Sequence, residues 1–384
     1  MMLRRLVLEG RMVVASLIVL VSGALAERAS AFETPARAAI LIDLQSDQVL
    51  FAKNPDEPLP PASMSKLMTA FMVFERLEDG SLGLDDTLPV SEKAWRKGGS
   101  KMFVEVGARV RVEDLLRGII IQSGNDACIV VAEGLAGSEE AFAEQMTQRA
   151  RELGLTHTTL KNASGWPDPE HLMSVRDLAL LAQTLIERFP NYYTLYSEKE
   201  FTYNGIRQYS RNPLLHQELG ADGLKTGYTD EAGYGLAASA VRDGRRLVMV
   251  LAGLERAGDR AREAERLLEY GFRQFKSYQL FSAGEAVGQA GVWLGSAPTV
   301  PLVLERDVVI SLTPEARREL EVKVVYDGPI PAPVVKGAQV AELEIVAPGI
   351  EPRRLPLLAS EEVRAAGLLS RATSALGYLI WGPS

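Results

Sequence analysis

The pattern of apolar and polar residues divides the chain into a helix-rich first part and a strand-rich last part. Two apolar runs, 38–42 and 48–52, flank a polar turn and predict a β-hairpin. Apolar residues then recur at helical spacing, which predicts helices over residues 65–77, 112–121, 126–135, 139–153 and 175–188. Strand patterns return at 235–241 and 246–251, followed by a predicted helix over 259–275. Strands at both ends with helices between them predict an α+β domain whose helices pack on a mixed sheet.

The pattern changes after residue 274. Segments such as 321–324 and 340–345 alternate or nearly alternate between apolar and polar side chains, and prolines and glycines separate them at short intervals. This pattern is typical of an all-β domain, and the length of the chain also favours two domains. We therefore expect an α+β domain over residues 32–275 and a small β-sandwich over residues 276–357, which serves as a stalk or docking module.

The last segment, residues 358–384, predicts an amphipathic helix. From Ser360 onward apolar residues recur at helical spacing, and Tyr378 and Trp381 lie near the end. Ser360 is suited to cap the first turn, and such a helix with terminal aromatic residues can lie in a membrane interface. Its polar face is not strongly basic, so adsorption would depend mainly on apolar burial. A helix folded back on the sandwich is the alternative.

The first 31 residues resemble an export signal. Three arginines precede an apolar run over residues 12–26, which is too short for a membrane-spanning helix and ends in Ala-x-Ala sites. Cleavage is expected after Ala26 or Ala31, with an uncleaved anchor as the alternative. Removing 1–31 takes away four arginines and two glutamates, so the net charge moves from -8 to -10. So acidic a chain argues against nucleic acid as a partner.

Ser63-Met64-Ser65-Lys66 is the most informative motif. Residues three apart share one face of a helix, so a helix that starts near Ala62 sets the Lys66 amine beside the Ser63 hydroxyl. A lysine kept neutral by burial or by a neighbouring cation can accept the serine proton and create a nucleophile without histidine. The spacing alone is weak, because about one S-x-x-K arises by chance in a chain of this length.

Two further motifs follow in order. Ser123-Gly124-Asn125 lies after the helical pattern of 112–121, and Lys225-Thr226-Gly227 lies before the returning strands. The succession S-x-x-K, S-x-N and K-T-G is the signature of serine enzymes that recognise penicillin. The alternative, in which Ser123 only caps a helix and Lys225 is a solvated strand residue, requires all three motifs to coincide by chance.

The sequence around these motifs resembles the low-molecular-mass penicillin-binding proteins that act as D-alanyl-D-alanine carboxypeptidases. The resemblance covers almost the whole chain and includes residues 61–69, 122–127, 196–199, 203–206 and 222–227. It implies a β-lactamase/transpeptidase-like fold, with stem peptides ending in D-Ala-D-Ala as substrates and β-lactam antibiotics as covalent inhibitors. It also implies that the last helix anchors the enzyme to the outer face of the cytoplasmic membrane.

The resemblance assigns the catalytic roles. Ser63 is the expected nucleophile and Lys66 the expected base. Ser123 is expected to bridge Lys66 and Lys225 and to pass a proton to the departing amine.

It assigns the binding roles as well. Asn125 is expected to hold the substrate amide, and Lys225 with Thr226 to bind the terminal carboxylate. Gly227 is expected to let the substrate backbone approach the strand, and the backbone N–H groups of Ser63 and Tyr228 to form the oxyanion hole. Many relatives carry histidine where this chain has Tyr228, so the pH profile or acyl-enzyme turnover is expected to differ.

Two further residues are candidates. Arg262 matches an arginine that helps to bind the carboxylate in the family, although an exposed helix arginine is an equal alternative. His171 follows Trp166-Pro167-Asp168 in a loop that borders the active site and affects deacylation in relatives. The alternative interpretation is that His171 is a polar loop residue without a catalytic role.

Other classes of protein are less well supported. The chain has neither G-x-S-x-G nor H-E-x-x-H, so a Ser-His-Asp hydrolase and a zinc peptidase lack their local signals, and we expect no metal or cofactor. Its single cysteine, Cys128, has apolar neighbours and is expected to be a buried, inert thiol. Three alternatives remain: a D,D-endopeptidase, a β-lactamase and a catalytically idle peptidoglycan-binding scaffold. The β-lactamase is less favoured because the chain lacks the E-x-x-L-N motif.

Overall fold

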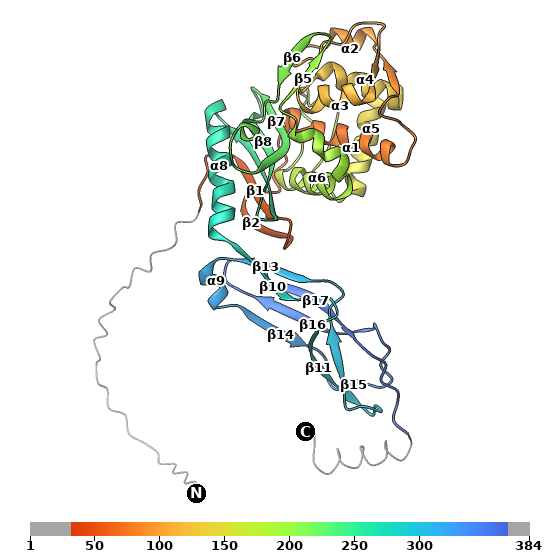
Figure 1. Ribbon diagram of the computed structural model, residues 1–384, viewed down its shortest axis with the longest axis vertical. Coiled ribbons are helices and arrows are strands. Elements are labelled where there is room, and N and C mark those ends of the chain that lie inside the picture. Colours follow the sequence, from red (N-terminus) through yellow and green to blue (C-terminus); the bar gives the residue numbers. More distant parts are fainter. Residues whose placement is uncertain (1–31, 368–384) are drawn as a thin grey trace, which may run out of the picture. The chain divides into compact units, whose positions relative to one another are not determined.

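The computed structural model describes residues 32–367 (Figure 1). The first domain is built on a five-stranded sheet in which every neighbouring pair of strands is antiparallel, where a mixed sheet was predicted, while the helices packed on it are as predicted. The predicted hairpin and both returning strands are confirmed. In spatial order the strands are β2 (Gln48–Lys53), β1 (Ala38–Asp43), β9 (Arg245–Leu254), β8 (Gly233–Arg242) and β7 (Ala221–Thr229).

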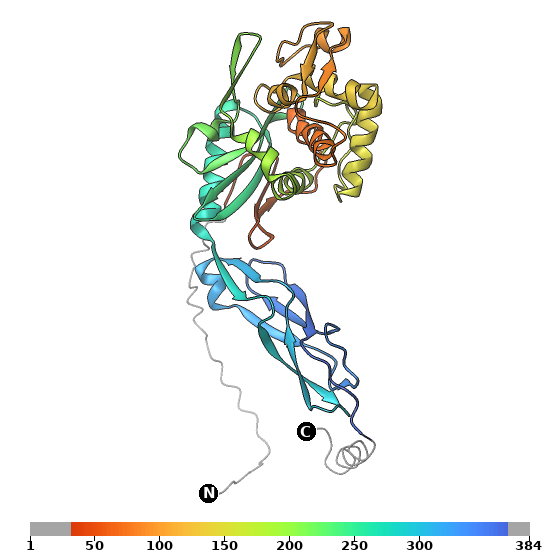
Figure 2. The ribbon, with the colours of Figure 1, turned by 45° about the vertical axis from the view of Figure 1, so that its right-hand side comes forward.

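Helices cover both faces of this sheet. α8 packs against β8 and β9 on one face, whereas α6 packs against β1 and β9 on the other (Figure 1, Figure 2). All six predicted helices of this domain are confirmed, with ends that shift by at most two residues. They are α1 (Lys66–Glu78), α3 (Val112–Ile120), α4 (Asn125–Ala136), α5 (Glu139–Glu152), α6 (Val175–Arg188) and α8 (Ala257–Gln274).

Helix α1 is the central element of the helical layer. Residues 66–74 are all buried, and only Lys66 and Thr69 among them are polar. A helix that is apolar all round is stable only inside a protein, so this sequence dictates its own burial. A 3₁₀ turn, η1 (Ala62–Ser65), leads into it and carries Ser63. The predicted helix therefore begins as a tighter turn.

Several short elements complete the domain. They are too short for periodicity to reveal them, and the sequence analysis does not predict them. They are β3 (Thr87–Pro89), α2 (Glu92–Arg96), β4 (Arg109–Arg111), α7 (Pro190–Tyr193), η2 (Thr194–Ser197), β5 (Glu200–Tyr203), β6 (Ile206–Tyr209) and η3 (Pro213–His216).

The second domain is all-β, as predicted. A two-stranded sheet pairs β10 (Lys276–Phe281) with β13 (Val308–Leu312), and a six-stranded sheet forms the rest. Its apolar core is separate from that of the first domain. The six strands, in spatial order, are β14 (Glu321–Val325), β16 (Gln339–Val346), β17 (Arg353–Ala359), β12 (Thr299–Val303), β11 (Ala286–Trp293) and β15 (Ile330–Pro331), and α9 (Pro314–Arg318) lies between β13 and β14.

The carboxylate of Asp43, at the end of β1, is fully buried. It accepts hydrogen bonds from Arg245 Nε at 2.8 Å and from the hydroxyl of Ser311 on β13. The backbone N–H of Ser311 in turn donates to Gln48 Oε1 at 2.5 Å. A buried charge is stable only when it is paired and hydrogen-bonded, so this junction ties β1 and β2 to the β domain.

The predicted C-terminal helix is wrong where the structure describes it. β17 continues to Ala359, and the residues that follow extend the β domain instead of starting a helix. Val363 pairs with Val334 and is only 1% exposed, and Ala365 pairs with Gly295. Helical spacing of apolar residues is only a local preference, and here tertiary packing overrides it by burying Val363 in the β domain. Residues 368–384 and the predicted signal peptide, 1–31, lie outside the described residues.

No helix within residues 32–367 has both the length and the apolar character needed to cross a membrane.

Candidate active site

The turn that carries Ser63 is held between two glycines from distant parts of the chain. A Cβ added to Gly227 on β7 would lie 2.7 Å from the carbonyl oxygen of Pro61. A Cβ on Gly165, whose φ is +73°, would lie 1.9 Å from the carbonyl oxygen of Ala62. Neither position has room for a side chain, so both glycines are required for the turn to lie where it does.

This packing gives a second reason for glycine at position 227. η1 itself approaches the strand there, while the expected approach of a substrate backbone stays a prediction. The third motif therefore positions the nucleophile of the first motif.

Lys66 lies beside the nucleophile, as predicted. Its Nζ is 2.7 Å from Ser63 Oγ, 2.8 Å from Asn125 Oδ1 and 2.5 Å from the carbonyl oxygen of Ser164. Burial lowers the pKa of Lys66 to about 8. About a tenth of the amine is then neutral at pH 7, which is enough to supply a base.

The three contacts also orient the amine. Asn125 Oδ1 and the Ser164 carbonyl can only accept hydrogen bonds, so a neutral Lys66 donates one N–H to each. Its lone pair is then left for the Ser63 hydroxyl. Ser164 could not be predicted, because a backbone carbonyl has no signature in the sequence.

Ser123 and Lys225 form the second part of the site. Lys225 is 3% exposed, and its Nζ donates to Ser123 Oγ at 2.9 Å and to the Thr226 carbonyl at 3.2 Å. Burial lowers the pKa of Lys225 well below its usual value, and the positive charge of Lys66 lowers it further. A proton on Lys66 therefore disfavours a proton on Lys225. Thr226 is also buried beside them.

The expected bridge from Ser123 to Lys66 is only half formed. Within the part of the chain that the structure describes, Ser123 Oγ is hydrogen-bonded to Lys225 and has no direct hydrogen bond to Lys66. The backbone of Ser123 has φ of 61°, a strained conformation for a residue other than glycine. Such strain is concentrated at functional sites, where the surrounding structure compensates for it.

Asn125 begins α4 and is 6% exposed. Its Oδ1 accepts from Lys66, and its Nδ2 donates to the carbonyl oxygen of Gly98 at 3.0 Å. Both ends of the amide are therefore used within the protein. The expected contact with a substrate amide stays a prediction, and it requires Nδ2 to be shared between Gly98 and the substrate.

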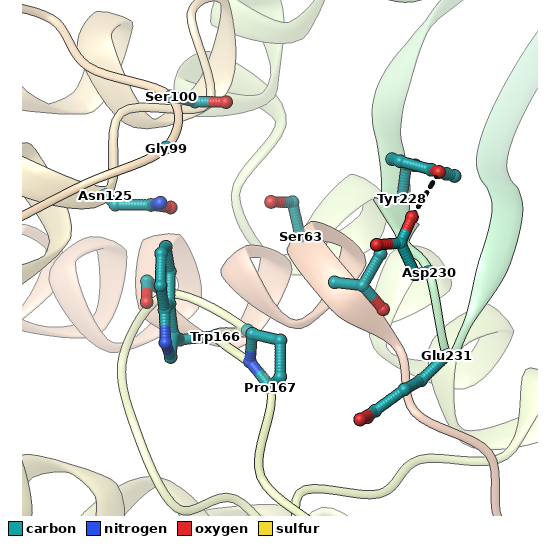
Figure 3. Close-up of a pocket in the computed structure, with 12 residues that line it drawn as sticks. Ser63, Gly99, Ser100, Asn125, Trp166, Pro167, Tyr228, Asp230 and Glu231 are labelled. Carbon is teal, nitrogen blue, oxygen red and sulfur yellow. Dashed lines mark hydrogen bonds between the residues drawn. The ribbon is translucent and has the colours of Figure 1, made fainter.

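These residues open into a cavity of about 530 Å³. Figure 3 shows Ser63 between two walls, with Trp166 and Pro167 on one side and Tyr228 and its neighbours on the other. The lining residues are Ser63, Gly99, Ser100, Asn125, Ser164, Gly165, Trp166, Pro167, Tyr228, Thr229, Asp230 and Glu231.

Tyr228 is fixed at the edge of this cavity. Its hydroxyl donates to Asp230 at 2.6 Å, and its ring stacks on Tyr234 with 4.2 Å between centroids. The carboxylate of Asp230 raises the pKa of Tyr228 to about 12. The hydroxyl of Tyr228 therefore stays protonated at neutral pH.

Arg262 is not brought to the site. Its side chain is 55% exposed and pairs with Asp259 at 2.8 Å and with Glu263 at 3.5 Å. Its position agrees with the alternative interpretation, in which Arg262 is an exposed arginine on a helix.

Two other arginines, neither of them predicted, supply positive charge instead. Arg260 stacks over the Tyr234 ring at 5.7 Å, and its charge contributes to the lowered pKa of Lys225. Arg211 donates to Ser100 Oγ at 2.6 Å, and its charge lowers the pKa of both catalytic lysines. Arg260 lies only two residues before Arg262, so local sequence alone cannot choose between them.

His171 lies behind the cavity, not in its lining. It is 2% exposed, and its Nδ1 accepts a hydrogen bond from the backbone N–H of Lys161 at 3.0 Å. Burial lowers the pKa of His171 to about 4. The ring is therefore neutral at pH 7, with its other nitrogen protonated.

Cys128 is buried, and burial raises its pKa to about 12. A thiol in such a setting is not nucleophilic at neutral pH. Among residues 32–367 no cluster of three or more histidine, cysteine, aspartate or glutamate side chains is arranged to hold a metal ion.

Comparison of the chain with known proteins identifies its family. Residues 25–255 match the peptidase S11 family, described as D-alanyl-D-alanine carboxypeptidase, and residues 275–365 match the C-terminal domain of penicillin-binding protein 5. The chain is 38% identical to the D-alanyl-D-alanine carboxypeptidase DacC of Escherichia coli over 344 residues, which cover 88% of this chain and 86% of DacC.

Solved structures agree. Penicillin-binding protein 5 from Haemophilus influenzae superposes with a TM-score of 0.80 at 33% identity, covering 87% of this chain and 98% of that protein. Penicillin-binding protein D2 from Listeria monocytogenes, solved in its ampicillin-bound form, superposes with a TM-score of 0.58 at 32% identity, covering 63% of this chain and 99% of that one. The chain belongs to the peptidase S11 family of D-alanyl-D-alanine carboxypeptidases.

Proposed function

We propose that this chain is a serine-type D-Ala-D-Ala carboxypeptidase. It removes the terminal D-alanine from peptidoglycan stem peptides through an acyl-enzyme on Ser63. The observation that carries the proposal is the pair of buried lysines, Lys66 at the nucleophile and Lys225 at the hydroxyl of Ser123. Family membership supports the same reaction.

Acylation starts at Ser63. Lys66 accepts the hydroxyl proton, and Oγ attacks the carbonyl between the two D-alanines. The backbone N–H groups of Ser63 and Tyr228 are proposed to hold the oxyanion, which needs donors already in place. A backbone donor does not depend on the side chain, so tyrosine at 228 preserves it.

The bond to the last D-alanine breaks when its nitrogen gains a proton. Ser123 passes that proton on, and Lys225 replaces it through the 2.9 Å hydrogen bond. Lys66 then passes the proton that it took from Ser63 to Lys225, so that overall one proton has moved from Ser63 to the leaving amine. Water adds to the acyl-enzyme and breaks the ester bond. Lys66 accepts one proton from this water and returns it to the Ser63 oxygen, and both lysines are back in their starting states.

The free carboxylate of the last D-alanine binds at Lys225 and Thr226. The charges of Arg211 and Arg260 act on the same region, because both contribute to the lowered pKa of Lys225. An incoming carboxylate relieves the repulsion among these cations and raises the pKa of Lys225 again. This arrangement favours a peptide whose leaving group is its last residue with a free carboxylate, which is the substrate of a carboxypeptidase.

β-lactams are proposed to acylate the same serine, since a relative of this fold has been solved in an ampicillin-bound form. We also propose that the protein acts outside the cytoplasm, on the periplasmic face of the cytoplasmic membrane. The basic and apolar pattern of residues 1–31 supports export, and the apolar pattern of residues 368–384 supports peripheral membrane association.

The deciding experiment measures release of D-alanine from a peptide that ends in D-Ala-D-Ala, with the Ser63→Ala variant as control. The wild type should release D-alanine and the variant should not. Release by the variant, or none by the wild type, contradicts the mechanism. Parallel assays with a cross-linked muropeptide and a penicillin separate an endopeptidase and a β-lactamase, and failure to label with a fluorescent penicillin would favour an idle scaffold.

A further inference from the structure

We propose that Asn162 is a positioning residue for Lys66. Its side-chain amide holds loop 162–166 in the shape that presents the Ser164 carbonyl to the Lys66 amine. The inference rests on the proposed function, because it concerns how the base of that reaction is oriented.

Among the described residues, the side-chain hydrogen bonds of Asn162 all lie within this loop. Its Oδ1 accepts from the backbone N–H of Ser164 at 3.1 Å, from the Ser164 hydroxyl at 3.3 Å and from the backbone N–H of Trp166 at 2.9 Å. Its Nδ2 donates to the carbonyl oxygen of Trp166 at 2.9 Å. One side chain therefore makes four hydrogen bonds to two residues, and these close the loop on itself.

The loop has no other internal framework. Outside helices and strands, no backbone-to-backbone hydrogen bond within the described chain involves residues 162–166. Buried backbone groups need partners, and in this loop the amide of Asn162 provides them in place of a regular ladder. Ala163 is held from outside the loop, because the Thr69 hydroxyl donates to its carbonyl at 2.6 Å and its N–H donates to the buried carboxylate of Glu139 at 3.4 Å. These two bonds tie the loop to α1 and α5, and Asn162 supplies the partners of Ser164 and Trp166.

The loop is also pressed against the nucleophile's turn at Gly165, where a Cβ would overlap the Ala62 carbonyl. The Ser164 carbonyl therefore faces Lys66 only while the peptide planes on both sides of Gly165 keep their orientation. Asn162 bonds the peptide groups on either side of the one that carries the Ser164 carbonyl, because the N–H of Ser164 belongs to the preceding plane and the N–H of Trp166 to the following plane. The plane of the Ser164 carbonyl is therefore held between two restrained neighbours. A displacement of about 1 Å at a catalytic group is able to cost about 100-fold in rate.

Asn162→Ala removes the restraint and has two consequences. The Ser164 carbonyl turns away, an N–H of Lys66 turns toward Ser63, and the plateau rate of acylation falls, by about 10-fold to 100-fold. Loss of an acceptor also destabilises the protonated amine, so the acid limb of the pH profile shifts to lower pH. Asn162→Asp keeps the acceptor for both N–H groups and adds a negative charge, so it should recover part of the rate and shift the acid limb to higher pH.

The test is the second-order rate of labelling by a fluorescent penicillin between pH 6 and 10, on the full chain. Wild type, Asn162→Ala, Asn162→Asp and Lys161→Ala are compared, and melting temperatures are measured alongside. Lys161 is the matched control, because it directly precedes the loop and its exposed side chain pairs with Glu170 at 3.0 Å. It should label like the wild type.

Opposite shifts of the acid limb in the two Asn162 variants, with partial rescue by aspartate, support the inference. It is overturned if both variants keep the wild-type midpoint, whether or not they label more slowly, since a merely structural loop lowers the rate without moving the profile. Should Asn162→Ala not fold, the midpoint of Asn162→Asp decides alone. Absence of labelling in the wild type refutes the proposed function instead.

Discussion

In the first domain, 23 polar or charged residues are buried, whereas in the described part of the β domain only Ser311 is. Burying a polar group costs free energy unless it finds hydrogen-bond partners, so each such group needs a specific local solution. The β domain avoids this cost by alternating apolar and polar positions along its strands. The first domain accepts the cost around Ser63, where two lysines lie in the interior.

The two regions are specified by the sequence in different ways. The β domain is specified by a repeating pattern that tolerates exchange between similar apolar residues. The catalytic region is specified by single atoms whose pKa values and orientations depend on burial. Substitutions in the two regions should therefore change different measurements.

The largest effect is expected at Lys66. Lys66→Gln removes the base, and D-alanine release and penicillin labelling should both fall by about 10²-fold to 10⁴-fold while the protein stays folded. The matched control is Lys323→Gln in the β domain, an exposed lysine paired with Glu321, which should leave both rates unchanged. Near-normal labelling by Lys66→Gln means that another group is the base.

The next largest effect is expected in the β domain. Leu343 on β16 is fully buried, and Leu343→Ala should lower the free energy of unfolding by about 2–5 kcal/mol. Chemical denaturation measures this loss, and the labelling rate below the transition should stay at the wild-type value. Val335→Ala, at a position that is 64% exposed, is the control and should change stability by less than about 0.5 kcal/mol. A slower labelling rate in Leu343→Ala would show that the regions are coupled.

The free energy of unfolding should depend on pH because of His171. Its folded-state pKa of about 4 lies below its usual value of 6.5, so the unfolded chain binds the proton first. Stability should therefore fall as the pH drops from 6.5 to 4, by about 3 kcal/mol from this residue alone. His171→Gln keeps an acceptor for the Lys161 N–H without titrating, and its stability should vary less over that window. Parallel curves for the two proteins would contradict this assignment.

The smallest effects should be alike in both regions. Ser138 caps α5 by accepting from the Ala141 N–H at 3.1 Å, and Thr313 caps α9 by accepting from the Ala316 N–H at 3.2 Å. Ser138→Ala and Thr313→Ala should each cost about 1 kcal/mol in denaturant unfolding. If the two variants lose the same free energy of unfolding, the two domains differ only in their buried polar groups. A much larger loss in one variant would mean that the domains also differ in how their helices are stabilised locally.

Long periodic elements could be predicted from the sequence. The bounds of α6 agree at both ends because Ser174 caps its first turn and its apolar stripe is regular. Ser63, Lys66, Ser123 and Lys225 could be named because each motif keeps fixed spacings, and the structure brings them together.

Other parts depend on contacts that a linear pattern does not contain. The Ser164 carbonyl belongs to no motif, and Arg211 and Arg260 differ from other arginines only in what surrounds them. The segment after Ala359 has helical spacing, but burial of Val363 in the β domain overrides that local preference. Tertiary packing decides such cases.

The two glycines that enclose the turn of Ser63 limit how this enzyme is able to evolve. Any side chain at Gly165 or Gly227 would overlap the backbone of Pro61 or Ala62, so a change there removes the activity before it alters selectivity. Variation that survives selection must arise at exposed positions of the walls, such as Trp166 and Tyr228. Escape from an inhibitor that blocks Ser63 is therefore expected to come from reshaped walls around an unchanged turn.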